Sequence, residues 1–144
     1  MVEVDETDLK ILKMLEEDGR RSFTEIGEKL RLSESAIRKR VEALQKKGVI
    51  KKFTVEIAPS TIGINTVAIV GVDVDPTKLL EIAQKLCELK EVRSVATSTG
   101  DHMIMTEIWT KDGRELTKII SEKIGKIEGV KKICPAIILE KLKG

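Results

Sequence analysis

The sequence predicts an α+β protein that has a helical N-terminal domain and a βαββαβ C-terminal domain. Three observations support this prediction. Apolar residues recur at helical spacing through the first 48 residues, a stretch containing Pro59, Gly63 and Asn65 follows, and the second half of the chain repeats a helix-turn-strand pattern after 38 residues. We therefore expect domains at residues 1–57 and 66–144, joined by a linker at 58–65.

Composition is that of a globular protein. Of the 144 residues, 41% are apolar and 35% are charged, which is enough apolar content for a packed core and too much for a disordered tail. The longest apolar runs are far shorter than the roughly 18–20 residues of a membrane span, and the first residues lack the features of a signal peptide. We expect a cytoplasmic protein that contacts no membrane. Abundant Lys and Glu with few Asn and Gln are typical of a thermophile source.

Cysteine and histidine usage argues against a metal site or a catalytic site. Cys87 and Cys134 are far apart and outside any Cys-x-x-Cys spacing, so we expect neither a disulfide nor a zinc site and read both as small buried residues. His102 is the only histidine, which leaves little from which to build a His-centred triad. We expect no catalytic residue, no metal and no cofactor.

Three helices are expected before Gly48. The first follows Asp5 and ends at Gly19, the second begins with a capping box of Ser22 and Glu25, and the third begins at Ser33 as its N-cap. The apolar residues that define their buried sides are Leu9, Ile11, Leu12 and Leu15 in the first helix, Ile26 and Leu30 in the second, and Ile37, Val41 and Leu44 in the third.

Charge is unevenly distributed along this domain. Residues 1–18 carry seven acidic and two basic residues, a net charge of −5, whereas residues 19–52 carry eleven basic and four acidic residues, a net charge of +7. A basic block of this density is typical of a surface that faces phosphates. A solvated lysine-rich surface is the alternative interpretation of charge alone.

The spacing of the second and third helices favours a helix-turn-helix that binds double-stranded DNA. With Ile37 facing inward, Ser35 and Lys39 lie near the opposite side of the third helix and Arg38 lies on its flank. Ser33 and Ser35 are small enough to let the backbone approach DNA, while Arg38 and Lys39 can reach base edges or phosphates. A plain three-helix bundle is the alternative, and Arg31 occupies the turn where glycine is common. Arg40 lies close to the apolar side, where it can pair structurally.

After Gly48, residues 49–57 alternate in polarity and predict a hairpin strand. Lys51 and Lys52 at its start are expected to bind phosphates.

The second half of the chain contains an internal repeat. Shifting it by 38 residues superimposes Ile82 on Ile120, and Val92 on Val130. The expected strands are residues 66–74, 92–99, 102–110 and 131–140, and the expected helices are residues 76–89 and 112–127. This order is the ferredoxin-like split motif.

The expected strands are apolar on both faces, whereas two helices can cover only one face of a four-stranded sheet. A second copy of the same sheet would cover the other. We therefore expect a homodimer, whose two helix-turn-helix domains would bind a pseudo-palindromic DNA site.

The chain resembles the Lrp/AsnC (feast/famine) transcription regulators over essentially its whole length. The matching stretches are residues 5–12, residues 33–50 and Thr99-Gly100-Asp101 between two strands. The resemblance implies a winged or hairpin-extended helix-turn-helix and a ferredoxin-like effector domain. It also implies dimers that often assemble into octamers, and amino-acid effectors bound between neighbouring effector domains.

Family positions carry over to this sequence at two places. The recognition-helix positions correspond to Ser33, Ser35, Arg38 and Lys39, and the effector loop corresponds to Thr99, Gly100, Asp101 and His102. Met103 stands where the family commonly has a second aspartate, and a thioether cannot accept the hydrogen bonds that an α-ammonium group offers. A plain β-turn explains Gly100-Asp101 equally well.

Two alternatives to a sequence-specific regulator remain. Siroheme decarboxylases look like this family in fold, and His102 lies in the right half of the chain for such an enzyme. The +7 block argues against this alternative, because a tetrapyrrole enzyme has no evident need for it. The other alternative is a non-specific architectural DNA binder.

Overall fold

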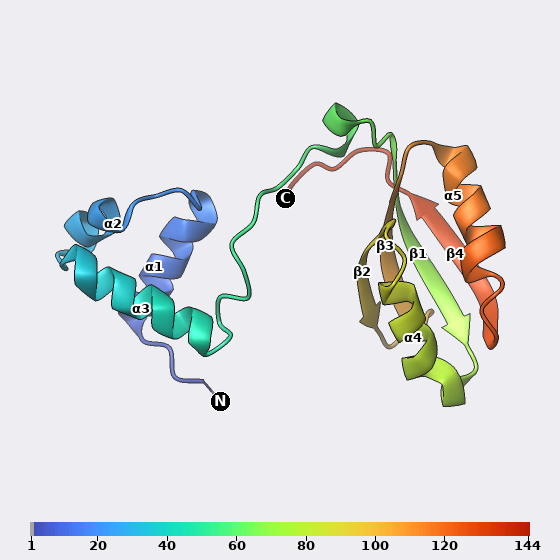
Figure 1. Ribbon diagram of the computed structural model, residues 1–144, viewed down its shortest axis with the longest axis horizontal. Coiled ribbons are helices and arrows are strands. Elements are labelled where there is room, and N and C mark those ends of the chain that lie inside the picture. The colour runs from blue at the N-terminus through green and yellow to red at the C-terminus, as the bar shows by residue number, and fades with distance from the viewer. Residues whose placement is uncertain (1) are drawn as a thin grey trace. The chain divides into compact units, whose positions relative to one another are not determined.

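The structure is a computed structural model, which describes residues 2–144 (Figure 1). The chain divides into two compact units, of which unit 1 ends at Glu56 and unit 2 begins at Ile57. Unit 1 contains the helices α1 (Glu6–Glu17), α2 (Phe23–Leu30) and α3 (Glu34–Lys46). Unit 2 contains η1 (Pro59–Ile62), β1 (Thr66–Val74), η2 (Pro76–Lys78), α4 (Leu79–Cys87), β2 (Val92–Thr97), β3 (Ile104–Thr110), α5 (Gly113–Ile119), η3 (Ile120–Ile124) and β4 (Val130–Ile137).

Side-chain caps begin all three helices of unit 1. Asp5 and Asp8 form a capping box at α1, in which each carboxylate accepts a hydrogen bond from the other residue's backbone N–H, at 2.7 and 3.3 Å. At α2 only half of the expected capping box forms. Ser22 Oγ accepts from the Glu25 N–H at 3.1 Å, whereas the Glu25 carboxylate lies 3.8 Å from Arg21 Nε.

A small apolar core holds the helices of unit 1 together. Its fully buried members are Ile11, Ile26, Ile37 and Val41, and Leu44 of α3 is buried as well. The expected pattern of inward-facing apolar residues is correct except at Leu9, which is 58% exposed. Leu9 follows Asp8 in the first turn of α1 and lies outside the stripe that Ile11 buries.

The hairpin strand expected at residues 49–57 is not formed. No residue between α3 and η1 is assigned to a strand, and Phe53, Val55 and Ile57 are all exposed. The physical reason is that a strand needs a neighbour to accept its backbone hydrogen bonds, and the described chain places no strand beside this segment. Residues 49–57 therefore have the alternating polarity of a strand but pair with no other strand in a single chain.

Unit 2 is an antiparallel sheet with two helices on one face. The strand order is β2-β3-β1-β4, which is the ferredoxin-like arrangement and confirms the α+β fold class. Alternate residues of β1 and β3 point into the core against α4, α5 and η3. The buried core residues are Ala68, Val70, Val72, Val74, Ile82, Leu86, Ile104, Ile108, Leu116, Ile119 and Ile124.

The outer face of this sheet is apolar and partly exposed. Val67 and Ile69 of β1 lie beside Trp109 and Glu107 of β3 in the register, and all four residues are half-buried. Arg93 stacks on the Trp109 ring at 4.2 Å from its centroid.

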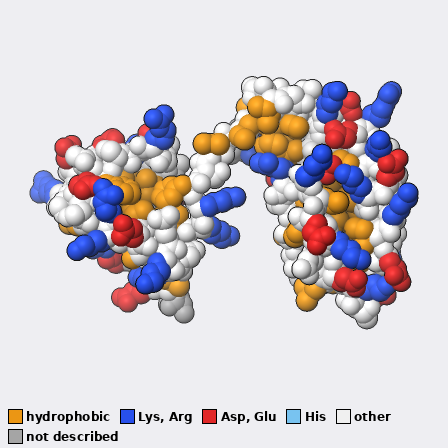
Figure 2. All heavy atoms as spheres, viewed as in Figure 1, with side chains coloured by type: hydrophobic (Ala, Val, Ile, Leu, Met, Phe, Trp, Pro, Cys, Tyr) orange, Lys and Arg blue, Asp and Glu red, His pale blue; other side chains and the backbone are white. Residues whose placement is uncertain are grey.

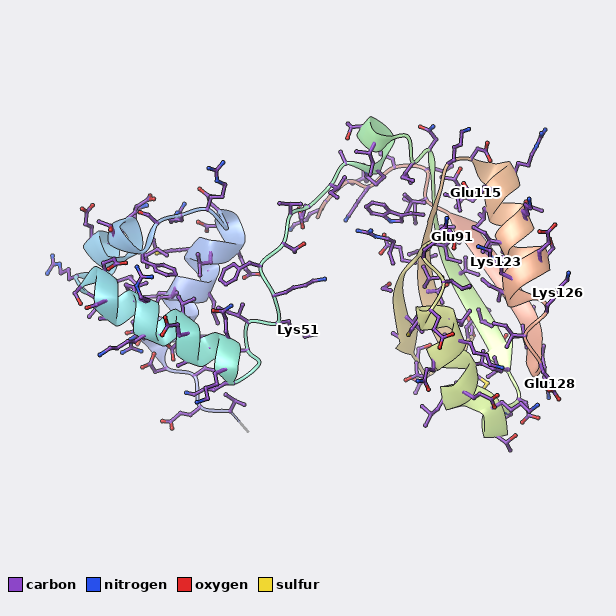
Figure 3. The ribbon with its side chains drawn as sticks, viewed as in Figure 1. Lys51, Glu91, Glu115, Lys123, Lys126 and Glu128 are labelled. Atoms are coloured by element: carbon purple, nitrogen blue, oxygen red, sulfur yellow. The ribbon has the colours of Figure 1, made fainter. Side chains whose placement is uncertain are left out.

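Both expected helices of unit 2 are present but irregular. Pro76 starts a short 3-10 turn before α4, and α5 continues into a π-helical turn, η3. This turn carries Lys123, whose Nζ donates to Glu91 Oε1 at 2.7 Å (Figure 3). The Glu91 side chain is 8% exposed, and its buried Oε2 has no hydrogen-bond partner in the described part of the chain.

The prediction that both cysteines are buried is wrong. Cys87 is exposed at the end of α4, and Cys134 is half-buried in β4. Cys87 lies about 100° around α4 from the buried Leu86 and is the last residue of this helix, which turns its side chain to solvent. No helix within residues 2–144 combines the length and apolar character needed to cross a membrane.

Candidate nucleic-acid interface

Helix α3 presents the side predicted for DNA contact to solvent. Ile37, Val41 and Leu44 are buried, while Ser35 and Lys39 on the other sides are exposed. Ser33 is the N-cap, and its Oγ accepts from the Ala36 N–H at 3.1 Å and lies 3.2 Å from Ser35 Oγ. Ser33 therefore fixes the start of α3 as well as lying at the expected interface.

The turn between α2 and α3 depends on Gly27, which sequence reasoning missed. A Cβ at Gly27 would lie 2.5 Å from the backbone oxygen of Leu32, so the chain after α2 folds back directly over this glycine. Arg31 adopts a left-handed conformation with φ 58°, and Leu32 N–H bonds to Gly27 O at 2.8 Å. A lone glycine inside a helical pattern was the signal for this close approach.

Arg38 and Lys39 are held differently although they are adjacent. The Arg38 guanidinium pairs with Glu34 on the preceding turn and lies 5.5 Å from the centroid of the Phe23 ring. Lys39 is exposed and takes part in no ion pair within residues 2–144. The Arg38 guanidinium is therefore held in place by Glu34, which competes with DNA for it, whereas no ion-pair partner within residues 2–144 competes for the Lys39 ammonium group.

Arg40 pairs structurally, as its place near the apolar side suggested. Its Nη1 donates to Asp5 Oδ2 at 2.7 Å and to Asp8 Oδ1 at 3.1 Å. The hydrogen bond from Arg40 holds the pKa of Asp5 below its ordinary value, and the same bond raises the pKa of Arg40. Lys51 and Lys52 follow α3 and are exposed, with Lys51 labelled in Figure 3.

The expected effector loop joins β2 to β3, and its residues differ in exposure and in their contacts. Thr99, Gly100 and Asp101 are exposed, and Gly100 has φ +104°. His102 instead turns toward β1, where its Nδ1 lies 3.2 Å from Asp73 Oδ2. Its ring lies over Gly71, at the place a Cβ would occupy.

Sequence reasoning missed Asp73 and Gly71. The second carboxylate oxygen of Asp73 accepts the Met103 N–H at 3.2 Å, so Asp73 ties the loop to the sheet. The period-two pattern of β1 places Gly71 and Asp73 on one face and could have drawn attention to both. Within residues 2–144 no group of three or more His, Cys, Asp or Glu residues could hold a metal ion.

Together, the fold and the site define a helix-turn-helix protein that carries a separate ferredoxin-like domain. Residues 4–45 match the AsnC-type helix-turn-helix domain, and residues 67–144 match the Lrp/AsnC ligand binding domain. The chain belongs to the Lrp/AsnC family. It is a DNA-binding transcriptional regulator with a ligand-binding domain.

Individual relatives agree with this assignment. The HTH-type transcriptional regulator LrpA of Pyrococcus horikoshii is 56% identical over 140 residues, which cover 97% of this chain and 99% of the relative. The crystal structure of PH0061 matches with a TM-score of 0.90 at 25% identity and covers 100% of this chain and 98% of that one. A Neisseria meningitidis regulator, NMB0573, solved as an L-Met complex, shares the fold with a TM-score of 0.90 at 23% identity, covering 99% of this chain and 94% of that one. The alternative of a siroheme-decarboxylase-like enzyme is not supported, because the relatives that span this chain are named transcriptional regulators.

Proposed function

We propose that α3 enters the major groove and that Lys39 is its principal contact to base edges or phosphates. The observation that carries this proposal is that Lys39 is exposed on the side of α3 opposite its buried residues and has no ion-pair partner among residues 2–144. Ser33 and Ser35 let the backbone approach DNA, and Arg38 reads bases from a position braced by Glu34 and Phe23. Lys51 and Lys52 bind phosphates beside the groove.

The regulator acts as a homodimer that can assemble further, up to an octamer. The partly exposed outer face of the sheet, with Val67, Ile69 and Trp109, supports a second sheet as its partner. Orange hydrophobic side chains are visible on both units in Figure 2, and Phe53, Val55 and Ile57 add an exposed apolar segment between α3 and η1. In such a dimer, the two α3 helices would bind half-sites about 10 base pairs apart on the DNA. We expect it to act in the cytoplasm, where its DNA lies.

A small effector with an ammonium group is expected at the loop of Thr99, Gly100, Asp101 and His102. Asp101 offers an exposed carboxylate that can accept hydrogen bonds from such a group. The solved relative with L-Met makes amino acids the first class to test.

The test begins with selection from a random library of duplexes of about 30 base pairs at about 0.15 M salt. Recovery of duplexes that share a pseudo-palindrome is expected. Lys39→Ala should then weaken binding to the selected duplex by about 1–3 kcal/mol, whereas Lys13→Ala, which removes the same charge from exposed α1, should leave it nearly unchanged. Equal affinity of the Lys39 variant and the unaltered protein would contradict the placement of α3, and uniform recovery would indicate an architectural role.

A further inference from the structure

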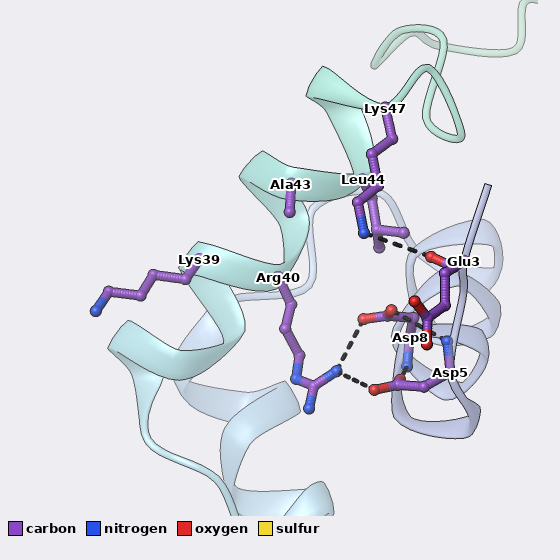
Figure 4. Close-up of a pocket in the computed structure, with 8 residues that line it drawn as sticks. All are labelled: Glu3, Asp5, Asp8, Lys39, Arg40, Ala43, Leu44 and Lys47. Atoms are coloured by element: carbon purple, nitrogen blue, oxygen red, sulfur yellow. Dashed lines mark hydrogen bonds and ion pairs between the residues drawn. The ribbon is translucent and has the colours of Figure 1, made fainter.

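Two adjacent residues of α3 point in different directions. In Figure 4, Lys39 extends away from α1, whereas Arg40 reaches toward the carboxylates of Asp5 and Asp8. A shallow pocket of about 280 Å³ lies between the two helices at this point, lined by Ala43 and Leu44 as well as by charged residues. Apolar contact between α1 and α3 is therefore interrupted where Arg40 lies.

The three residues Asp5, Asp8 and Arg40, named here the Arg40 clamp, form a closed set of hydrogen bonds. Asp5 uses Oδ1 to cap α1 and Oδ2 to hold Arg40, while Asp8 uses Oδ2 for the cap and Oδ1 for Arg40. Every carboxylate oxygen thus has a fixed partner. The Asp8 side chain is only 12% exposed, so the clamp is partly shielded from solvent.

Such a clamp adds directional contacts to the apolar packing of α3, in which Ile37, Val41 and Leu44 are buried. Burial of apolar surface is non-directional, and unit 1 has only five buried apolar residues. A rotation of α3 about its axis would turn Lys39 away from its ligand. Charge-assisted hydrogen bonds resist that rotation because their geometry is narrow. Lys47 makes a further contact between the end of α3 and the chain before α1, with its Nζ 3.4 Å from the Glu3 backbone oxygen.

We propose that Arg40 is a positioning residue for DNA recognition: the Arg40 clamp fixes the rotation of α3 on α1 and so aims Lys39, while Arg40 itself contacts no phosphate. This inference rests on the proposed function, in which α3 is the helix that reads DNA. It assigns a role in binding to two acidic residues, although acidic side chains near DNA are repelled by it.

The decisive variant is Asp5→Asn, because loss of its charge and loss of its positioning role should change DNA affinity in opposite directions. Asparagine caps helices as well as aspartate does, so α1 keeps its start, but the amide nitrogen cannot accept from Arg40. Loss of a negative charge alone would strengthen DNA binding. Loss of the Arg40 clamp should instead weaken binding to the selected duplex by about fivefold.

Glu6→Gln is the matched control. It removes the same charge from the next residue, where Glu6 makes only an exposed pair with Lys10 at 3.7 Å. Its affinity should equal or slightly exceed that of the unaltered protein. If Asp5→Asn also binds as tightly as Glu6→Gln, the inference is wrong.

A salt titration separates positioning from direct contact. Arg40→Ala should lower affinity while the slope of log affinity against log salt concentration stays unchanged, and Arg40→Lys should recover part of the loss. A slope reduced by about one would mean that Arg40 neutralises a phosphate, which overturns the inference. Thermal melts monitored by circular dichroism establish that each variant is folded at the binding temperature.

The two proposals fail in different ways. If Lys39→Ala has no effect, α3 does not read DNA as proposed and the proposed function fails. If Lys39→Ala weakens binding while Asp5→Asn strengthens it, α3 reads DNA and only the role of the Arg40 clamp is refuted.

Discussion

The two units of this regulator achieve order by different means. Unit 2 buries eleven apolar residues between a sheet and its helices, whereas unit 1 buries five among three short helices. Unit 1 compensates with polar geometry: the capping box of Asp5 and Asp8, the Arg40 clamp, and a turn that closes over Gly27. The DNA-reading surface thus stands on the unit with less apolar packing.

This difference indicates which kinds of substitution each unit tolerates. A large core tolerates the loss of a surface pair, since most of its stability comes from buried area. A small core leaves the orientation of its helices to a few hydrogen bonds and to backbone geometry, each of which involves one or two residues. Substitutions that change such geometry should therefore affect unit 1 more than the area they bury would suggest.

Gly27→Ala is expected to have the largest effect and would break unit 1 selectively. The new Cβ would meet the Leu32 backbone oxygen at 2.5 Å, and backbone cannot move aside as a side chain can. We expect a loss of about 2–4 kcal/mol in the stability of unit 1, together with loss of DNA binding. Differential scanning calorimetry of the full chain should show the transition of unit 1 shifted to lower temperature.

Gly113→Ala supplies the control for this prediction in unit 2. Within residues 2–144, no atom other than those of its chain neighbours and its own helix backbone lies within 4 Å of a Cβ at Gly113, and this residue begins α5. Alanine there should be neutral or slightly stabilising, because it lowers the entropy of the unfolded chain. Equal melting of the Gly27 and Gly113 variants would show that the turn is not the constraint described here.

The same contrast explains what the sequence could predict in unit 1. Periodicity and capping residues placed all three helices, since both are local properties of the chain. Periodicity also placed Lys39 on the exposed side. Gly27 and the Asp5–Arg40 pair were beyond such reasoning, because each depends on which segments meet across the tertiary fold. The segment at residues 49–57 has a strand pattern, but pairing requires a neighbour that a pattern cannot supply.

In unit 2 the repeat predicted the order of elements, but strands that are apolar on both faces did not show which face the helices cover. The partner of His102 could not be predicted, since Asp73 lies 29 residues earlier in the chain and only the sheet brings the two together. Likewise the π-helical turn that carries Lys123 to Glu91 has no local sequence signature.

The pair of Glu91 and Lys123 allows a test of medium size in unit 2. Burial is the largest single influence on the pKa of Glu91 and would raise it, but the hydrogen bond from Lys123, a backbone hydrogen bond and the charges of Lys123 and Lys90 together lower that pKa below its ordinary value. A carboxylate with a depressed folded-state pKa stabilises the fold at pH values above its unfolded pKa, and that stability is lost as the pH falls through the folded-state pKa.

Glu91→Gln should therefore cost about 1–2 kcal/mol at pH 7 and almost nothing in acid. Urea unfolding monitored at pH 7 and at about pH 3, below the ordinary glutamate pKa, would measure both values. Glu88→Gln is the control, because Glu88 is exposed and makes no ion pair within residues 2–144. A cost for the Glu91 variant that is the same at both pH values would mean that its charge is not the source of the stability.

The smallest expected effect would strengthen unit 1 instead of weakening it. Arg31 ends α2 with φ 58°, a conformation in which a side chain is strained and glycine is not. Arg31→Gly should raise the stability of unit 1 by about 0.5–1 kcal/mol, the relief of strain minus the entropy that glycine adds to the unfolded chain. Arg31→Ala removes the same charge but keeps the Cβ, so it should bring no gain. If the alanine variant melts as high as the glycine variant, the stabilisation comes from relieved charge repulsion, and the turn of unit 1 carries no strain to remove.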